Sequence, residues 1–498
     1  MTRALSRRYL LGAAALAVAA PLAGRVAFGQ AQERLRLPPL IDTRASGRLA
    51  LRAQPGELSI RGGPPALTAG YNQNYLGPTI VMQNGPLAVR VENALQEPVS
   101  SHWHGLLVPG EQDGGPHKAI APGEAWTGDM DLSQRPCTPW YHSHAHGSTA
   151  RHVYAGLAGM INYTDGRDDQ RGLPSRYGID DLSLVIQDRR FDDSGRMIYN
   201  PDSTDIQNGF QGSRILVNGQ FNAIAPVPRG IVRLRLLNGS NARFYTLHFN
   251  DRRPFFLVGT DGGLLPNPLE MTYMRIAPAE RMEILVDFGE GPAPVLMSAS
   301  GLPMKILEFA IDETQPRRIV RVPETLDAEP AWPDADSLPL RRFALNMGGS
   351  SLAEVKQGAG IHSVHAGHGA PARLIGSGPN GELGIGMTDF GINGRAYDMK
   401  RIDFAVKLGA FERWIISGGG AGVLHPFHVH GVHFRVVSTA GAPPKPEDSG
   451  WKDTVVVDGQ AEIIVKFERT ASADAPYMYH CHILEHEDAG MMGQFTVA

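Results

Sequence analysis

Apolar and polar residues alternate along three well-separated stretches of the chain. The stretches are residues 85–93, 230–238 and, more weakly, 411–417. Alternate side chains of a strand point to opposite faces of a sheet, so this period of two predicts half-buried β-strands. Each stretch follows a segment that contains Asn and Gly, at residues 74–77, 218–219 and 393–394. The recurrence predicts three copies of one β-sandwich unit.

A chain of 498 residues is too long for one compact core and fits two to four domains. We expect an all-β fold with domains at residues 35–165, 177–323 and 341–498. The linker between the second and third domains contains the four prolines Pro323, Pro330, Pro333 and Pro339. Within the third domain, residues 356–383 show little periodicity and predict a surface loop.

The first residues resemble an export signal rather than a part of the fold. Arg7 and Arg8 precede an apolar run at residues 9–20, in the pattern of a twin-arginine signal. Small residues at 27–31 offer cleavage sites. We therefore expect a signal peptide at residues 1–31, export by the twin-arginine machinery and a periplasmic location. A membrane anchor is the alternative, but the apolar run is shorter than the ~20 residues that a spanning helix needs, so we expect no membrane association after cleavage.

Composition and charge narrow the class further. Hydrophobic residues make up 42% and charged residues 20% of the chain, as in ordinary globular proteins. The formal net charge is -4, which does not indicate binding to nucleic acid. The two cysteines, Cys137 and Cys481, are able to form one disulfide in an exported protein, unless one of them has another partner.

The placement of the histidines carries most of the chemistry. Five pairs have the spacing His-x-His, whereas random placement of 18 histidines in 498 residues predicts fewer than one. The pairs are His102/His104, His142/His144, His144/His146, His428/His430 and His480/His482. On a strand, both members of such a pair point to the same face. Neutral imidazole is a ligand for copper, zinc, iron and nickel, so the pairs predict a metal centre.

Cys481 lies between His480 and His482. If these residues form a strand, the two histidines face one way and Cys481 faces the other, so that one tripeptide serves two metal sites. Cys481, His486 and Met491 are part of the mixed donor set of a blue-copper site, which has two histidines, one cysteine and a weak axial methionine.

The second histidine of the blue-copper site is expected to be His425. Copper at Cys481 leaves Cys137 as a buried free thiol. The eight remaining paired histidines are enough for three copper ions with open positions for O2. They are His102, His104, His142, His144, His428, His430, His480 and His482.

Four motifs, at residues 102–105, 140–144, 425–430 and 480–491, resemble those of the multicopper oxidases. The chain is most similar to the bacterial copper-efflux oxidases and bacterial three-domain laccases. This finer resemblance lies in residues 109–116, 261–266, 450–454 and 485–488. It implies three cupredoxin-like domains, which are Greek-key β-sandwiches, and it agrees with the threefold repeat.

The resemblance also implies four copper ions and their ligands. The type 1 copper takes His425, Cys481, His486 and Met491, the type 2 copper takes His102 and His428, and the type 3 pair takes His104, His142, His144, His430, His480 and His482. Two acidic residues of the family, here Asp113 and Glu487, would deliver protons to reduced oxygen. His117, His146, His152, His248 and His433 are interpreted as ordinary residues rather than ligands.

The family implies one-electron oxidation of a small reducing substrate, coupled to four-electron reduction of O2 to water. We expect a laccase-like enzyme acting on phenols or aromatic amines. Cuprous ion is a second candidate substrate, in a role in copper tolerance, and manganese is a third. The only methionines in residues 345–387 are Met347 and Met387, and residues 418–424 contain neither Asp nor Met. Cuprous ion prefers sulfur ligands, so these features favour phenols.

Proteins of other classes remain open. A copper-sequestering protein would bind copper without turnover, and a scaffold protein of the cell envelope would use the fold alone and contain no copper. Structural zinc needs only four ligands and leaves most of the histidines unexplained. His362, His365 and His368 lie in the expected loop and are interpreted as solvated. We expect a monomer, because the family implies that one chain contains every ligand.

Overall fold

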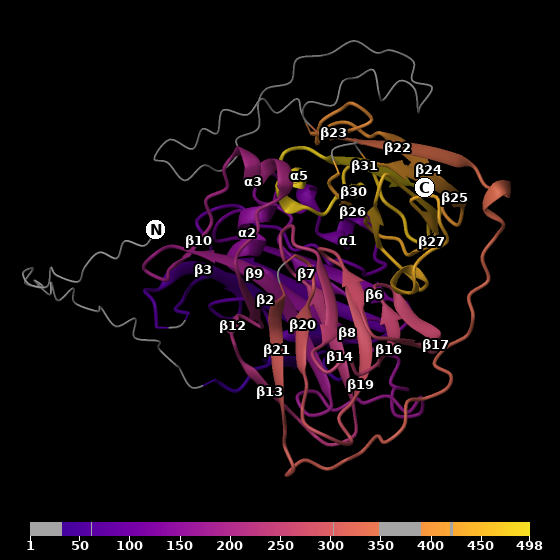
Figure 1. Ribbon diagram of the computed structural model, residues 1–498. Coiled ribbons are helices and arrows are strands. Elements are labelled where there is room, and N and C mark those ends of the chain that lie inside the picture. Colours follow the sequence, from indigo (N-terminus) through magenta and orange to yellow (C-terminus); the bar gives the residue numbers. More distant parts are fainter. Residues whose placement is uncertain (1–31, 61, 302, 348–389, 419–421) are drawn as a thin grey trace, which may run out of the picture. The chain divides into compact units, whose positions relative to one another are not determined.

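The computed structural model describes residues 32–60, 62–301, 303–347, 390–418 and 422–498 (Figure 1). The expected signal peptide and the expected loop at 356–383 lie outside the described residues. Within the described part, strands dominate, and none of the helices has the length and apolar character needed to cross a membrane. The helices are α1 (Gly110–Asp113), α2 (Thr149–Ala155), α3 (Ser203–Asn208) and α5 (Leu484–Asp488), and the 3-10 turns are η1 (Pro116–Lys118), η2 (Ala335–Ser337) and η3 (Pro446–Asp448).

The first β-sandwich has sheets with the strand orders β1-β4-β8-β7 and β3-β2-β5-β6. One buried core joins the two sheets and contains, for example, Leu51 and Ile161. The strands are β1 (Leu40–Asp42), β2 (Arg48–Leu58), β3 (Ala66–Tyr71), β4 (Thr79–Met82), β5 (Gly85–Asn93), β6 (Ala125–Leu132), β7 (Trp140–His142) and β8 (Ala158–Tyr163).

The second β-sandwich has sheets with the orders β12-β11-β9-β14-β19-β16-β17 and β13-β21-β20-β15-β18, and β10 pairs with β9. Its core includes Leu234 from one sheet and Leu247 from the other. The strands are β9 (Asp181–Phe191), β10 (Met197–Ile198), β11 (Arg214–Val217), β12 (Gln220–Phe221), β13 (Ile224–Val227), β14 (Ile231–Asn238), β15 (Tyr245–Phe249), β16 (Phe255–Thr260), β17 (Gly263–Met271), β18 (Met274–Ile276), β19 (Arg281–Asp287), β20 (Val295–Ser298) and β21 (Met304–Ile311).

The third β-sandwich has sheets with the orders β23-β22-β25-β29-β27 and β24-β31-β30-β26-β28, and Trp414 and Phe427 share its core. The strands are β22 (Leu340–Asn346), β23 (Gly391–Ile392), β24 (Phe404–Val406), β25 (Phe411–Ser417), β26 (His425–Val429), β27 (Phe434–Thr439), β28 (Thr454–Val457), β29 (Gln460–Lys466), β30 (Tyr477–Cys481) and β31 (Met492–Val497). The expected all-β fold of three cupredoxin-like sandwiches is confirmed, while the exact domain boundaries stay a prediction.

The three alternating stretches become β5, β14 and β25, and each pairs in parallel with an earlier strand of its own sandwich. The prediction of half-buried strands is wrong for β14, in which all eight residues are buried. Its polar positions include Arg233 and Arg235, which pair with buried carboxylates. This pairing makes the burial of their charges tolerable.

An asparagine with a left-handed backbone conformation precedes each of these strands. The residues are Asn72, Asn218 and Asn393, with φ of 60°, 51° and 55°. In each case the side-chain oxygen accepts a hydrogen bond from a backbone N–H of the earlier strand. The side-chain nitrogen donates to the carbonyl oxygen of the residue two positions before that N–H, in the same strand. Asparagine tolerates this conformation and makes such bonds readily. In the first sandwich the equivalent position is therefore Asn72, before the expected segment at 74–77.

Candidate metal centre

Sheet pairing brings the histidine motifs together. β26 carries His428 and β30 carries His480, and the register of these neighbouring strands places the two residues opposite each other. In the first sandwich, His102 and His142 are joined by two backbone hydrogen bonds, of 2.9 and 3.1 Å. The first and third sandwiches thus each supply a rigid backbone for two of the motifs.

Three donor atoms converge at the expected type 1 position. The Cys481 sulfur lies 3.4 Å from His425 Nδ1 and 3.6 Å from His486 Nδ1. Bonds of ~2.0 Å to nitrogen and ~2.3 Å to sulfur at a tetrahedral angle would separate the donor atoms by about 3.5 Å, so this arrangement fits one metal ion. Met491 is buried in the same core, and its carbonyl oxygen accepts a hydrogen bond from the Cys481 N–H at 3.1 Å.

Burial sets the protonation of these groups. It lowers the pKa of His425 to about 4 and that of His486, which also lies near His425, to about 3. Both rings are therefore neutral at pH 7, which is the form that binds a metal. Burial raises the pKa of the Cys481 thiol, so a metal ion would have to displace its proton.

The other eight histidines form one buried cluster. His480 Nε2 lies 3.4 Å from His144 Nε2 and 3.2 Å from His430 Nε2. Two nitrogen atoms bound to one ion at ~2.0–2.1 Å would be separated by about 3.3 Å, so these three rings also fit a metal ion. The remaining ring nitrogens include six that are buried and lack a hydrogen-bond partner: His102 Nε2, His104 Nδ1, His142 Nε2, His428 Nε2 and both nitrogens of His482.

Unpartnered buried polar atoms are rare in native proteins, and each of them calls for an explanation. Here they belong to the residue type that metals bind. Those of His102, His104, His142 and His428 lie in groups whose donor atoms are within 4.8 Å of one another, whereas the His482 nitrogens belong to none of these groups. One such group is His102, His104 and His142, and another is His102, His428 and His430. The donor set therefore fits several copper ions.

The Asp113 carboxylate contacts the Nδ1 atoms of two rings of the cluster. Its Oδ2 accepts a hydrogen bond from His430 Nδ1 at 2.8 Å and lies 3.2 Å from His102 Nδ1. A carboxylate in this position orients an imidazole ring and leaves the opposite nitrogen free for a metal ion.

The Glu487 carboxylate contacts the Nδ1 atoms of two other rings in the same way. Its two oxygens lie 3.3 Å from His144 Nδ1 and 3.1 Å from His480 Nδ1. Burial raises the pKa of Glu487, but the two histidines outweigh that effect and hold its pKa at about 2. The carboxylate is thus ionised at neutral pH. The expected role of Asp113 and Glu487 in proton delivery stays a prediction.

Asp453 is a residue of the site that sequence reasoning missed. It is fully buried, and its Oδ1 lies 3.1 Å from His104 Nε2 and accepts a hydrogen bond from Arg281 Nη1 at 2.8 Å. Arg281 lies in the second sandwich, so this contact ties the cluster to that domain. The only signal in the sequence is that Asp453 lies in residues 450–454, a segment that resembles the copper-efflux oxidases.

The histidines interpreted as ordinary residues lie outside the donor groups of the described residues. His433 Nε2 contacts the Gly105 carbonyl oxygen at 3.1 Å, and the ring of His146 packs edge-on against Tyr397. The three histidines of the expected loop lie outside the described residues. Cys137 is a buried free thiol, as predicted.

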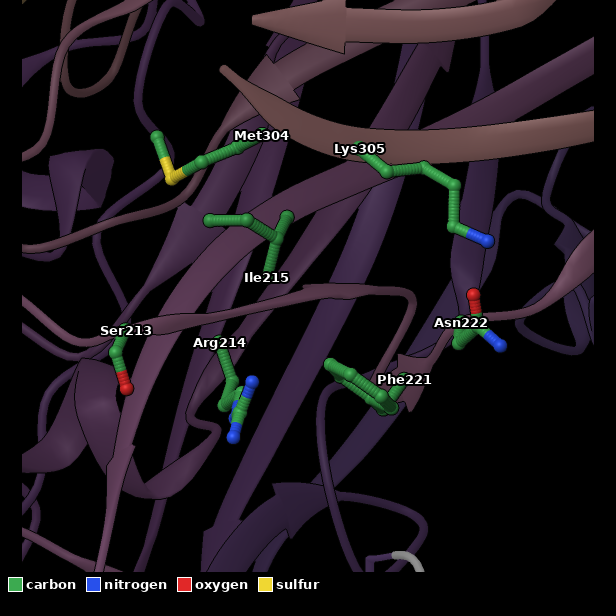
Figure 2. A pocket seen from close by; sticks show the side chains of 7 residues that line it. All are labelled: Ser213, Arg214, Ile215, Phe221, Asn222, Met304 and Lys305. Carbon is green, nitrogen blue, oxygen red and sulfur yellow. The ribbon is translucent and has the colours of Figure 1, made fainter. Parts of the chain in front are cut away.

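A pocket of about 200 Å³ lies in the second sandwich (Figure 2). Its lining is formed by Ser213, Arg214, Ile215, Phe221, Asn222, Met304 and Lys305. None of these residues is an expected ligand, so the pocket is not part of the metal centre.

Known proteins resemble this chain over its full length. Family models of multicopper oxidase domains match residues 52–167 and 378–498. A solved structure of the laccase-like multicopper oxidase CueO from the lignin-degrading bacterium Ochrobactrum sp. is 40% identical, with a TM-score of 0.82, and the match covers 93% of this chain and 100% of that one. The McoA multicopper oxidase of Aquifex aeolicus is 30% identical, with a TM-score of 0.77 and coverage of 94% and 100%.

The curated relatives carry a different name. Cell division protein FtsP of Yersinia pestis is 37% identical, and that of Escherichia coli is 36% identical; each match covers 99% of both chains. This finding contradicts the expected function as a laccase-like oxidase, together with its cuprous-oxidase and copper-sequestering alternatives. Ligand motifs report which metal a fold is able to hold, whereas the process that a protein serves depends on surfaces elsewhere on the fold. The matched domains, the fold and the full-length relatives show that this chain belongs to the multicopper oxidase family.

Proposed function

We propose that the chain acts in cell division in the bacterial envelope, with copper bound in its core. The supporting observation for the division role is the likeness to the FtsP proteins, which covers 99% of the chain at 35–37% identity. Likeness confined to the copper motifs would support metal binding alone, because partner-binding surfaces lie outside them. Residues 1–31 would direct the chain to the periplasm, and its partners there would be proteins of the division apparatus.

We further propose that the core holds four copper ions on the ligands that the resemblance implies. The convergent donor atoms and the unpartnered ring nitrogens support this assignment. When bound, copper supplies one-electron redox chemistry, which is the chemistry of the oxidase class to which the family belongs. Asp113 and Glu487 hold the imidazole rings in the orientation for binding. Copper bound only by the folded chain also stabilises it.

Deletion of the gene from the bacterium that encodes this chain should produce longer cells with delayed constriction. Supplying the full chain should restore normal cell length, because the proposed partners lie in the envelope. A matched control lacks residues 1–31 and should fail to restore length, since that protein would stay in the cytoplasm. Cell length is measured by microscopy of growing cultures. Normal length in the deletion strain would contradict the division role.

Protein purified from the periplasm should contain close to four copper ions per chain, as measured by elemental analysis. Replacing His142 and His144 by Ala removes two expected ligands of the type 3 pair and should lower the copper content without removing the blue-copper site. Full-length wild-type protein that is folded but takes up no copper would contradict the copper core. It would leave the interpretation as an envelope scaffold that uses the fold alone.

A further inference from the structure

Ser143 stands between two expected copper ligands, and its side chain is fully buried. Its hydroxyl oxygen lies 2.8 Å from His152 Nδ1. Its carbonyl oxygen accepts a hydrogen bond from His142 Nδ1 at 2.9 Å. The second bond places the proton of the His142 ring on Nδ1 and leaves Nε2 bare, and that Nε2 is one of the buried nitrogens without a partner. The position of Ser143 therefore decides where the His142 donor points.

His152 is buried on α2, with 2% of its surface exposed, and connects Ser143 to a carboxylate. Its Nε2 lies 3.5 Å from Glu97 Oε1. Arg151 Nη1 donates to the same Glu97 oxygen at 2.7 Å, and its Nη2 contacts the other oxygen. The contacts with His152 and then Arg151 lower the pKa of Glu97 to about 2. The carboxylate is therefore ionised and acts only as a hydrogen-bond acceptor.

His152 Nε2 also lies 3.4 Å from Arg151 Nη2, so this nitrogen is placed between a donor and an acceptor. On the other side of the ring, Nδ1 is hydrogen-bonded to the Ser143 hydroxyl, whichever of the two groups donates. The hydroxyl is thus held against the ring. The three residues form a line from the partly exposed Glu97, through α2, to the end of β7, where His142 and His144 lie.

The helix α2 is itself held by the third sandwich. The Asp488 carboxylate of α5 accepts hydrogen bonds from the backbone N–H groups of Thr149 at 3.0 Å and Ala150 at 2.9 Å. It thereby caps α2 from another domain, because the side chain of the N-cap residue Ser148 makes no capping bond. α5 packs directly against α2 (Figure 1) and carries Glu487, which contacts the His144 ring. His152 is therefore positioned relative to both halves of the cluster.

A serine, a histidine and a carboxylate in line also occur in hydrolases, where the serine attacks a substrate. That interpretation does not fit here, because Ser143 and the inner edge of the His152 ring are enclosed and no part of a substrate could reach the hydroxyl. The arrangement serves instead to hold the backbone at the end of β7.

We propose that Ser143 and His152, supported by Glu97, are positioning residues that hold His142 and His144 in place for copper. This inference rests on the copper core of the proposed function and is independent of its role in division. The buried contacts hold the backbone at Ser143 in one geometry, as second-layer contacts do at metal sites.

The test compares copper loss from purified, copper-loaded protein to a chelator in the variants Ser143→Ala and His152→Leu. Both should release copper from the histidine cluster roughly 10- to 100-fold more readily than wild type, the usual effect of losing a second-layer contact. The blue absorption, which arises at Cys481, should persist. His152→Gln retains a group able to bond Ser143 and should recover most of the copper retention.

Ser240→Ala is the matched control, because the Ser240 hydroxyl is also buried and lies 2.8 Å from another side chain, the Tyr245 hydroxyl, in the second sandwich. It should leave copper retention unchanged. Wild-type retention in Ser143→Ala and His152→Leu would overturn the inference. So would parallel loss of cluster copper and blue absorption, which indicates general destabilisation. Wild-type protein without copper would instead refute the copper core itself.

Discussion

Replacing Cys481 with Ser should abolish the blue absorption of the copper-loaded protein while leaving copper in the histidine cluster. The colour of such a site depends on a cysteine thiolate bound to copper. Cys481 is fully buried, and its sulfur lies within 3.6 Å of the nitrogens of two neutral imidazoles, His425 and His486. A serine hydroxyl is a harder donor and forms no equivalent bond. Absorption spectroscopy and copper analysis measure the two effects separately.

The same substitution should weaken the stabilisation that copper gives to the fold. A ligand present at a thousand times its dissociation constant stabilises the folded state by about 4 kcal/mol. The copper-dependent increase in the urea midpoint should therefore shrink in Cys481→Ser.

Cys137→Ser is the matched control for Cys481→Ser, because Cys137 is the other buried free thiol. That variant should stay blue and retain the full effect of copper on stability. A Cys481→Ser protein with undiminished blue colour would show that the type 1 site lies elsewhere.

Replacing Arg233 with Met should reduce the free energy of unfolding by about 3–5 kcal/mol, the usual effect of removing one partner from a buried ion pair. Arg233 Nε donates to Glu283 Oε2 at 2.8 Å, and Arg233 Nη1 donates to Asp168 at 3.1 Å. Both Arg233 and Glu283 have 1% of their side chains exposed. Met occupies a similar space but leaves the carboxylates in excess over the remaining guanidinium group of Arg235.

Acid should reduce the difference between Arg233→Met and wild type. Burial alone raises the pKa of Glu283, but Arg233 and then Arg235 outweigh it, so that the pKa lies below the ordinary range in the folded wild type. A lowered folded-state pKa contributes stability above the unfolded-state pKa, and this contribution is lost as the pH falls through the folded-state value. Urea unfolding at several pH values measures the trend.

Arg44→Met is the control for Arg233→Met, because Arg44 forms an ion pair with Asp42 in which both side chains are more than 40% exposed. Exposed pairs contribute about 1 kcal/mol or less, so its urea midpoint should barely change. Equal effects of the two substitutions would contradict the assignment of a buried charge network.

Local periodicity predicted the paired histidines as ligands, and the family resemblance assigned them to copper sites. His480, Cys481 and His482 lie on or beside one strand, and alternation along it sends the cysteine and the histidines to different sites. The same period revealed β5 and β25, whose core and solvent faces differ in hydrophobicity. The free thiol of Cys137 could also be predicted from the sequence, because a blue-copper site at Cys481 leaves Cys137 without a disulfide partner.

For β14 the alternation of apolar and polar residues led to a wrong prediction of exposure, because other parts of the protein cover the charged face of the strand. Arg233 and Arg235 look solvated in the sequence, since an alternating strand commonly exposes its polar side. Their partners Asp168, Asp181 and Glu283 are distant in sequence, and no local pattern reveals them. Only the packing of the second sandwich shows that these charges are enclosed and mutually compensated.

The family resemblance, the β-sandwich repeat and the expected donor set could all be predicted from the sequence, because each arises from residues a few positions apart. Tertiary structure alone decided how the donors are held: Asp453 reaches His104, and His152 reaches Ser143 from a helix that Asp488 caps. The process that the protein serves also lay beyond the ligand motifs. The physical reason is the same in each case, since contacts between residues far apart in the chain depend on the packing of whole sandwiches and leave no periodic signal in the sequence.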